Sequence, residues 1–151
     1  METAGEMGEA VRTNLDRADI LIMAAAVSDY RFPEISPRKI KKSETSRSVE
    51  LVRTEDILES LPEKRGAQIV IGFAAETEDV MKNAFEKLKR KNLDLIVAND
   101  VSSQDSGFES DFNRISLIYP GGREVEVELG TKRDISRTIL DAIEGIIEEK
   151  D

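Results

Sequence analysis

The sequence predicts an α/β fold, a three-layer αβα sandwich with a mainly parallel sheet and a C-terminal antiparallel hairpin. Three apolar runs without alternation, Ile20–Val27, Ile69–Ala75 and Leu93–Ala98, are typical of parallel strands covered on both faces. Segments with apolar residues at helical spacing stand before, between and after these runs. The length of 151 residues suits one domain, so we treat residues 1–151 as a single domain.

The N-terminal part is expected to contain a helix, the first strand and a long connection. Thr3 and Glu6 form a capping-box pattern, which indicates a helix that leads into the first apolar run. Residues 28–48 are polar, and a connection of this length inside a compact domain is usually functional or disordered. Val49–Arg53 is a candidate strand, and Thr54 is expected to cap a helix that stops before Gly66. The apolar residues of that helix are Ile57, Leu58 and Leu61.

The C-terminal part carries further turn and cap signals. Thr77 is the expected N-cap of a helix between the second and third apolar runs, and Asn92 is its expected stop. Pro120-Gly121-Gly122 lies between two strand-like segments and predicts a hairpin, one face of which meets water. Thr131 with Asp134 is expected to cap a last amphipathic helix.

The composition excludes several kinds of site. The chain has no Cys and no His, so a cysteine nucleophile, a serine–histidine pair and the usual zinc sites are excluded within it. A bound metal would depend on oxygen ligands or phosphates, which favours Mg²⁺. The net charge of −9 argues against a general nucleic-acid surface. The apolar runs are too short for a membrane span and no signal-peptide pattern opens the chain, so we expect a cytoplasmic protein without a membrane partner.

A ligand site is expected at the carboxyl ends of the predicted strands, as in other open α/β sheets. The corresponding segments are residues 24–30, 72–77 and 99–103. A glycine followed by Phe73 suits the stacking of a base, although both residues could equally fill the core. Asp29 could accept from a sugar hydroxyl or a base amine, hold Mg²⁺, or simply cap a turn.

Lysines are the clearest charge feature of this acidic chain. Lys39-Ile40-Lys41-Lys42 could close over phosphates and neutralise them, or could form an ordinary solvated loop. Lys87 and Lys91 share one face of a helix, where complementation of the helix dipole explains them equally well. As residues of a helix C-terminus, they are expected at the sheet edge opposite the strand ends. The chain has neither a G-x-G-x-x-G nor a Walker A motif, so a phosphate-cradling turn lies outside it or is not needed.

Several of these segments occur together in one known family. In chain order they are Ala24-Ala25-Ala26-Val27-Ser28-Asp29-Tyr30-Arg31, Lys39-Ile40-Lys41-Lys42, Thr54-Glu55-Asp56-Ile57-Leu58, Gly72-Phe73-Ala74-Ala75-Glu76-Thr77, Lys91-Asn92-Leu93-Asp94 and Ala98-Asn99-Asp100-Val101-Ser102, followed by Phe108, Ser110, Asp111 and Asn113. Together they resemble phosphopantothenoylcysteine synthetase, the phosphopantothenate–cysteine ligase of coenzyme A biosynthesis. In many bacteria and archaea this domain is the C-terminal half of a bifunctional flavoprotein.

The resemblance implies a Rossmann-like fold, a homodimer and a two-step ligase reaction. The carboxylate of 4'-phosphopantothenate attacks the α-phosphate of CTP, or of ATP in eukaryotic relatives, and Mg²⁺ assists the release of pyrophosphate. Cysteine then displaces CMP from the acyl-cytidylate. FMN would belong only to a separate decarboxylase half, fused to this domain or associated with it.

The resemblance also implies roles for single residues. It assigns catalytic roles to Lys39, which would meet the phosphates, and to Asn99. The implied nucleotide contacts are Met23, Ala24, Ala25, Asp29, Lys39, Glu55, Asp56, Ile57, Leu58, Phe73, Lys87 and Lys91. The family commonly has proline where this chain has Glu55, which matters little if the contacts there are main-chain ones.

One departure from the family is serious. Its glycine-rich first strand–turn and its Asn-x-Ser-Ser-Gly-Lys-type motif, whose Asn serves the second half-reaction, are absent from the chain. We therefore expect a truncated domain that lacks the N-terminal part and is inactive alone. The alternative is a non-catalytic dimerisation or regulatory module on the same fold. A dinucleotide-dependent oxidoreductase is suggested by fold class only and lacks its glycine fingerprint.

Overall fold

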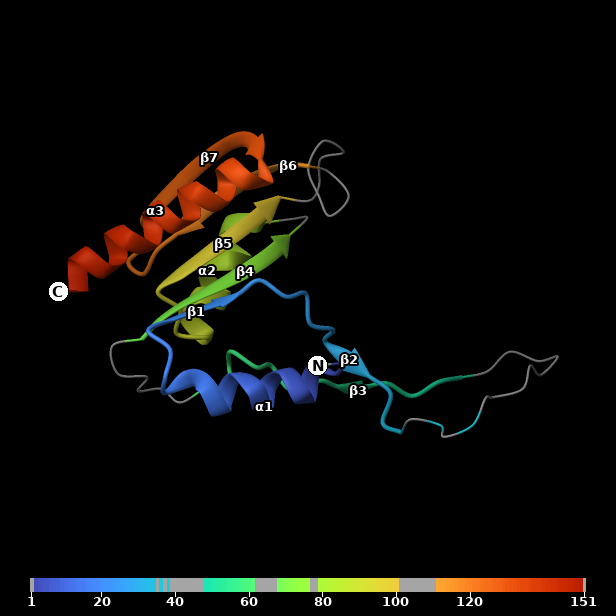
Figure 1. The fold of residues 1–151 in the computed structure, drawn as a ribbon. Coiled ribbons are helices and arrows are strands. Elements are labelled where there is room, and N and C mark those ends of the chain that lie inside the picture. The colour runs from blue at the N-terminus through green and yellow to red at the C-terminus, as the bar shows by residue number, and fades with distance from the viewer. Residues whose placement is uncertain are drawn as a thin grey trace.

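The computed structural model of the chain describes residues 2–34, 36, 38, 48–61, 68–76, 79–100 and 111–150 (Figure 1). Its helices are α1 (Ala4–Leu15), α2 (Val80–Arg90) and α3 (Lys132–Lys150). Its strands are β1 (Ile20–Met23), β2 (Tyr30–Arg31), β3 (Val52–Arg53), β4 (Ile69–Glu76), β5 (Leu95–Asp100), β6 (Phe112–Ile118) and β7 (Glu124–Thr131).

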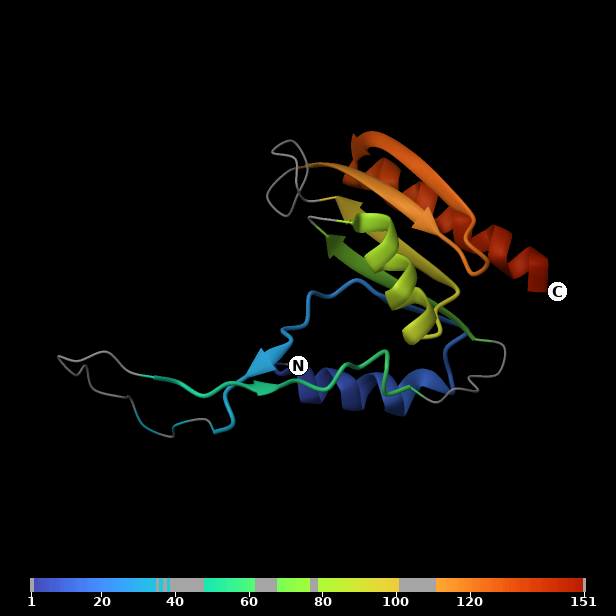
Figure 2. The same ribbon diagram turned by 180° about the vertical axis from the view of Figure 1, so that it is seen from behind.

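The main sheet has five strands in the order β1-β4-β5-β6-β7. β1, β4 and β5 are parallel, whereas β6 and β7 continue the sheet as an antiparallel hairpin. The helices α2 and α3 lie on opposite faces of this sheet (Figures 1 and 2). β2 and β3 form a separate antiparallel ladder near the start of α1. This arrangement confirms the predicted α/β sandwich with its C-terminal hairpin.

Each face of the sheet buries its own core, because successive strand residues point to opposite faces. Val70, Ala74 and Ile96 belong to the core shared with α1, α2 and residues 57–61. Ile71, Leu95, Val97 and Leu117 belong to the core beneath α3. The residues that α3 contributes are Ile135, Ile139, Ile143 and Ile146. The two cores meet across β4 and β5, which are therefore the most deeply buried strands.

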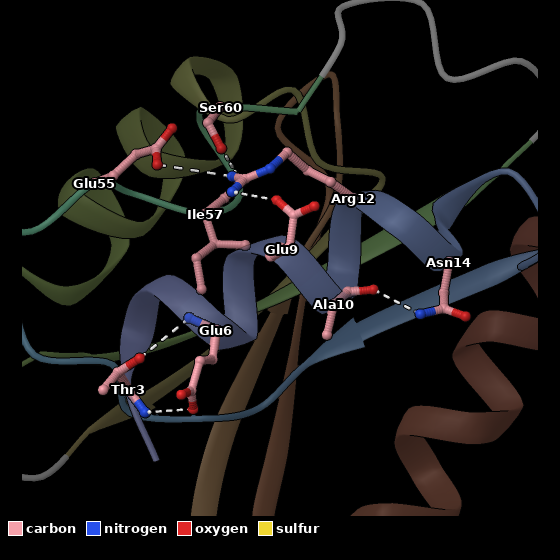
Figure 3. Close-up of polar contacts among 9 residues, drawn as sticks. All are labelled: Thr3, Glu6, Glu9, Ala10, Arg12, Asn14, Glu55, Ile57 and Ser60. Carbon is pink, nitrogen blue, oxygen red and sulfur yellow. Dashed lines mark hydrogen bonds and ion pairs between the residues drawn. The ribbon is translucent and has the colours of Figure 1, made fainter. Parts of the chain in front are cut away.

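Local capping signals were predicted correctly at both ends of the chain. The Thr3 hydroxyl accepts from the Glu6 amide at 3.2 Å, and the Glu6 carboxylate accepts from the Thr3 amide at 3.3 Å (Figure 3). Amide donation from Glu2 and Thr3 also holds the pKa of Glu6 below its ordinary value. At the start of α3, the Thr131 hydroxyl accepts from the Asp134 amide at 3.2 Å. The expected cap Thr77 lies outside the described residues.

The expected turns are also present. Gly121 and Gly122 adopt φ angles of +87° and +89° between β6 and β7, a region that glycine enters without steric cost. Asn92 adopts a φ of +49° directly after α2 and its C-cap, as a helix stop requires. β7 is largely exposed, which agrees with a hairpin that meets water on one face.

The first apolar run differs from its prediction. Only Ile20–Met23 forms a strand, and this strand pairs with β4 alone among the described strands. Ile20 and Ile22 keep 36% and 43% of their surface exposed, so β1 is not covered on both faces. On the face of the sheet where α3 lies, no helix of the described part of the chain covers β1. α3 packs on β6 and β7, at the other edge of the sheet.

The helix expected after Thr54 is also absent from the described residues. Residues 57–60 form a turn, closed by a hydrogen bond from the Ser60 amide to the Asp56 carbonyl at 3.0 Å. The polar cap of this turn is Asp56, whose carboxylate accepts from the Glu59 amide at 3.2 Å. Pro62 follows in the sequence, and a proline disfavours helical geometry in the residue before it. This preference opposes the continuation of a helix beyond the described turn.

Candidate functional site

A small cavity of about 90 Å³ lies where the chain leaves β1 and where it returns after β3. We call it the strand-end cavity. Seven of the predicted nucleotide contacts line it: Met23, Asp29, Glu55, Asp56, Ile57, Leu58 and Lys91. Val27, Ser28 and Thr54, which are not among the predicted nucleotide contacts, complete the lining. The structure thus brings together residues that are up to 68 positions apart, from Met23 to Lys91, in the sequence.

The wall of the strand-end cavity is built from two segments that are joined through their main chains. The Thr54 amide donates to the Asp29 carbonyl at 2.8 Å, which extends the short ladder of β2 and β3 toward the sheet. The turn after Asp56 then directs Ile57 and Leu58 into the core beneath α2. Burial of these two side chains anchors the polar residues beside them, because the free energy of apolar burial opposes any movement of the turn.

An ion pair closes one side of the strand-end cavity. Lys91 Nζ lies 2.7 Å from Asp56 Oδ2, and the two side chains keep only 18% and 29% of their surface exposed. Burial by itself would raise the pKa of the Asp56 carboxyl. The hydrogen bond from Lys91, the Glu59 amide and the charge of Lys91 outweigh burial, so the pKa of Asp56 lies below its ordinary value. Asp56 is therefore a carboxylate at neutral pH, and it holds Lys91 at the cavity wall.

The same wall is connected to α1 (Figure 3). The Arg12 guanidinium lies 3.7 Å from the Glu55 carboxylate and 3.4 Å from that of Glu9. Gly8 of α1 lies next to the turn, because a side-chain carbon at this position would be in ordinary van der Waals contact with Ile57, at 3.5 Å. Both ion pairs of Arg12 are exposed and contribute little energy, so packing of the turn against α1 is the main connection.

The position of Lys91 corrects one prediction. As a residue of a helix C-terminus, Lys91 was expected at the sheet edge opposite the ligand site. It directly precedes the start of β5 and still lines the strand-end cavity with Met23, because β1 is short and Met23 is in register with Gly72 and so with Ile96, near the start of β5. The turn after Asp56 lies on the α2 face of the sheet, where it brings Asp56 to Lys91. Lys87, one turn earlier on α2, is not part of the cavity lining.

The remaining predicted residues do not line this cavity. Ala24 and Ala25 follow β1 and are exposed. Phe73, which is 40% exposed, and Asn99 take the strand positions that alternate with those facing α2, so they belong to the opposite face of the sheet. Lys39 lies outside the described residues, and its approach to phosphates stays a prediction.

Gly72 serves packing rather than ligand approach. A side-chain carbon at this position would lie 2.6 Å from Leu93 Cδ1 and 3.5 Å from Leu58 Cδ1. The glycine therefore lets Leu58 and Leu93 pack directly on β4. Of the two explanations left open by the sequence, the core explanation holds for Gly72.

Two buried polar atoms have no hydrogen-bond partner in the described part of the chain: Thr54 Oγ1 and Asn99 Oδ1. Thr54 lines the strand-end cavity, whereas Asn99 pairs with Ala75 and Ile115 inside the sheet. Thr54 is the first residue of the quoted Thr54–Leu58 motif and was expected to cap a helix, but the cap of the turn is Asp56.

A larger hollow of about 290 Å³ lies between α2 and the hairpin. Its charged residues are Arg114, Glu124, Glu126 and Glu128, and none of the predicted nucleotide contacts lines it. Within the described ranges no group of three or more acidic side chains is placed to hold a metal ion, and no helix has the length and apolar character needed to cross a membrane.

Residues 1–146 match the DFP family, described as the DNA/pantothenate metabolism flavoprotein C-terminal domain. The chain is similar to the coenzyme A biosynthesis bifunctional protein CoaBC of Bacillus subtilis (strain 168). The two are 42% identical over 146 residues, which are 97% of this chain and 36% of that protein. The chain thus spans only about a third of the length of this relative.

Solved structures agree with this match. The crystal structure of the C-terminal domain of a coenzyme A biosynthesis bifunctional protein CoaBC is 36% identical with a TM-score of 0.78, and the match covers 99% of this chain and 65% of that one. A Cab2 mutant in complex with phosphopantothenate-cysteine shares the fold with a TM-score of 0.65 at 16% identity, over 94% of this chain and 51% of that one. These matches confirm the resemblance drawn from the sequence motifs: the chain belongs to the family of DNA/pantothenate metabolism flavoprotein C-terminal domains.

Proposed function

We propose that the chain is the nucleotide-binding part of a phosphopantothenate–cysteine ligase that acts in coenzyme A biosynthesis. The observation that carries this proposal is the gathering of the seven residues named above around the strand-end cavity. The CoaBC relative is named for coenzyme A biosynthesis, and the distant Cab2 structure holds phosphopantothenate-cysteine, the product of such a ligase. Both names fit the proposed reaction.

The proposed reaction has two steps. A carboxylate oxygen of 4'-phosphopantothenate attacks the α-phosphorus of CTP, and the bond to pyrophosphate breaks. The cysteine amine then attacks the acyl carbon, loses a proton and displaces CMP. The chain has no cysteine and no histidine, which suits a reaction whose nucleophiles belong to the substrates. The protein then needs only to position the reactants and to stabilise phosphate charge.

The chain's own residues divide these tasks. Lys91, held by Asp56, would donate to the nucleotide from the cavity wall, and the main chain at Ala24 and Ala25 would approach it from the end of β1. Lys39 would neutralise phosphate charge. Mg²⁺ would be held mainly by phosphate oxygens and water, because the described residues offer no group of three acidic ligands.

Further features of the proposal follow from the family. The nucleotide is CTP, with ATP as the alternative, the ligase is a homodimer in the cytoplasm, and an FMN-dependent decarboxylase half is fused to it or associated with it. Sedimentation at several concentrations tests the dimer. A stable dimer without nucleotide affinity would favour the alternative, a dimerisation or regulatory module.

The test of the proposed function is calorimetry of CTP and ATP with the full-length protein that carries this chain. We expect CTP to bind and Lys91→Met to weaken its binding about tenfold or more, as loss of a charged hydrogen bond predicts. Lys150→Met is the matched control, because Lys150 pairs with Asp94 and does not line the cavity. Pyrophosphate release should require phosphopantothenate, and CMP release should require cysteine. A full-length protein that binds neither nucleotide would refute the proposal.

A further inference from the structure

Four large apolar side chains are exposed on the two segments that lead away from the strand-end cavity. We call residues 30–34 and 49–53 the arm; it contains β2 and β3, and Figures 1 and 2 show that it extends away from the main sheet. Tyr30 and Phe32 keep 59% and 58% of their surface exposed, and Val49 and Leu51 keep 57% and 52%. Soluble monomers rarely expose several large apolar groups together, and such a patch typically marks a contact surface.

The pairing of β2 with β3 places these side chains on one side of the arm. Tyr30 pairs directly with Arg53. Paired residues of an antiparallel ladder point to the same face, and residues two apart in an extended chain do so as well. Phe32 therefore shares the face of Tyr30, and Leu51 and Val49 share the face of Arg53, which is the same one. We call this surface the arm face.

The arm lacks the packing that a ladder of this size needs. β2 and β3 contain two residues each, and a two-stranded ladder is at best marginally stable alone in water. A hydrogen bond from the Thr54 amide to the Asp29 carbonyl, at 2.8 Å, ties only its inner end to the wall of the strand-end cavity. Because more than half of each apolar side chain stays exposed, the described part of the chain does not supply the layer that covers the arm face.

The size of the arm face suits a contact between two proteins. Half of the surface of a tyrosine, a phenylalanine, a valine and a leucine amounts to about 300 Å². A stable interface buries about 800 Å² on each partner, with an apolar centre and a polar rim. The four side chains thus supply a large part of the apolar centre, and the polar residues around them supply the rim.

Charge favours a second copy of the chain as the partner. The chain carries a net charge of −9, so two copies repel each other at long range. The arm itself is neutral: Arg31 and Arg53 lie in the ladder, and Glu34 and Glu50 lie farther out along the arm. A two-fold axis across the arm sets the arginine end of one arm beside the glutamate end of the other, so opposite charges meet at both ends.

The exposed edge of the main sheet is less suited to a second copy. β7 is an edge strand, and its residues Glu124, Glu126 and Glu128 alternate with apolar ones. Two such edges brought together would set like charges side by side, which protects edge strands against pairing. The arm carries no such row of one charge.

We propose that two copies of the chain associate through the arm face, with Phe32 and Leu51 at the centre of the contact. This inference rests on the proposed function in one respect, because it gives the proposed homodimer its contact surface. The arm begins next to Asp29 and ends next to Thr54, which both line the strand-end cavity, so the contact lies beside the candidate site of each copy. Neither the family match nor the likeness to CoaBC assigns a contact surface to these residues.

The experiment compares two leucines of equal exposure in the full-length protein that carries this chain. Leu51 of the arm is 52% exposed and Leu140 of α3 is 53% exposed, so Leu140→Ser is the matched control. Sedimentation over a range of concentrations measures association, and far-UV circular dichroism shows whether each variant is folded. We expect the double variant Phe32→Ser/Leu51→Ser to weaken association about a hundredfold, since each contact at the centre of an interface is worth about tenfold. Leu140→Ser should associate as the wild type does.

Cross-linking decides the case in which the double variant does not fold or another part of the full-length protein also holds copies together. Leu51→Cys and Leu140→Cys are each treated with a short bis-maleimide, and the wild type measures the background, because this chain has no cysteine of its own. We expect a covalent dimer from Leu51→Cys and only background from Leu140→Cys.

The outcomes separate the contact surface from the proposed function. Equal cross-linking of Leu51→Cys and Leu140→Cys, or equal weakening of association by the double variant and by Leu140→Ser, would overturn the inference while the ligase proposal stands. If the wild type stays monomeric at every concentration, the homodimer and this inference both fail. Calorimetry with CTP then still decides whether the chain belongs to a ligase.

Discussion

The ion pair between Asp56 and Lys91 should be worth more than an ordinary surface pair. Its 2.7 Å separation and its low exposure place it between exposed pairs, worth about 0–1 kcal/mol, and fully buried ones, whose disruption costs about 3–5 kcal/mol. Lys91→Met leaves Asp56 with the Glu59 amide as a donor, so part of the carboxylate's stabilisation survives. We therefore expect Lys91→Met to lower the free energy of unfolding by about 1–2 kcal/mol.

A double-mutant cycle of Asp56→Asn and Lys91→Met isolates the pair from the other effects of each substitution. Urea denaturation followed by far-UV circular dichroism suits the chain, which has no tryptophan. The expected coupling energy is about 1–2 kcal/mol. The matched control is the cycle of Arg123→Met and Glu149→Gln, because this pair is 3.7 Å apart and exposed at both ends. Its coupling should stay below about 0.5 kcal/mol.

The coupling should depend on pH in a direction that the pKa of Asp56 sets. Since this pKa lies below its ordinary value of 3.8, the unfolded chain binds the proton before the folded chain does as the pH falls. The stabilisation is therefore complete well above pH 3.8 and is lost as the pH falls through the lower pKa of the folded state. A coupling no larger than that of the Arg123–Glu149 control at neutral pH, or one that persists unchanged in acid, would refute this reasoning.

Three further substitutions test the packing at Gly72, the hydrogen bond from the Val70 amide of β4 to the Asp94 carboxylate at 2.7 Å, and the cap of α3, each by urea denaturation. Gly72→Ala places a carbon 2.6 Å from Leu93 Cδ1 and should destabilise the chain by about 1–3 kcal/mol, and no loss would mean that Leu93 adjusts freely. Asp94→Ala removes the acceptor of a β4 amide and of Lys150, and should cost about 2–3 kcal/mol. Its control Lys150→Met removes only the ion pair and should cost less than about 1 kcal/mol. Equal losses for the two substitutions would mean that the hydrogen bond to the β4 amide contributes nothing. Thr131→Ala removes the cap of α3 and should cost about 1 kcal/mol, whereas Thr131→Ser should be near neutral.

Features that depend on neighbouring residues could be predicted from the sequence. The capping box at Thr3, the cap at Thr131 and the glycine turn of the hairpin each require only residues within a few positions. The buried strands β4 and β5 were equally clear, because strands covered on both faces have no polar alternation.

Features that depend on distant parts of the chain could not be predicted. The run that begins at Ile20 is as apolar as those of β4 and β5, yet its burial depends on what covers its second face. The expectation that Lys91 lies apart from the end of β1 was wrong, because β1 ends at Met23, close to the start of β5, and residues 54–61 cross the same face. Only the path of residues 54–61 brings Asp56 within 2.7 Å of Lys91.

Thr54 and Asp56 show why a candidate site needs both kinds of information. Both are short polar residues of one motif, and sequence spacing alone gives either of them the same chance of capping the turn. In the structure Asp56 has taken the capping role and a lysine partner, whereas the Thr54 hydroxyl is buried with neither. Asp56, whose bonds are satisfied, holds the wall of the cavity together, whereas the buried Thr54 hydroxyl contributes no hydrogen bond to it. Which polar residues build the wall of this cavity is therefore decided by the hydrogen bonds that the fold makes, and sequence spacing alone does not show those bonds.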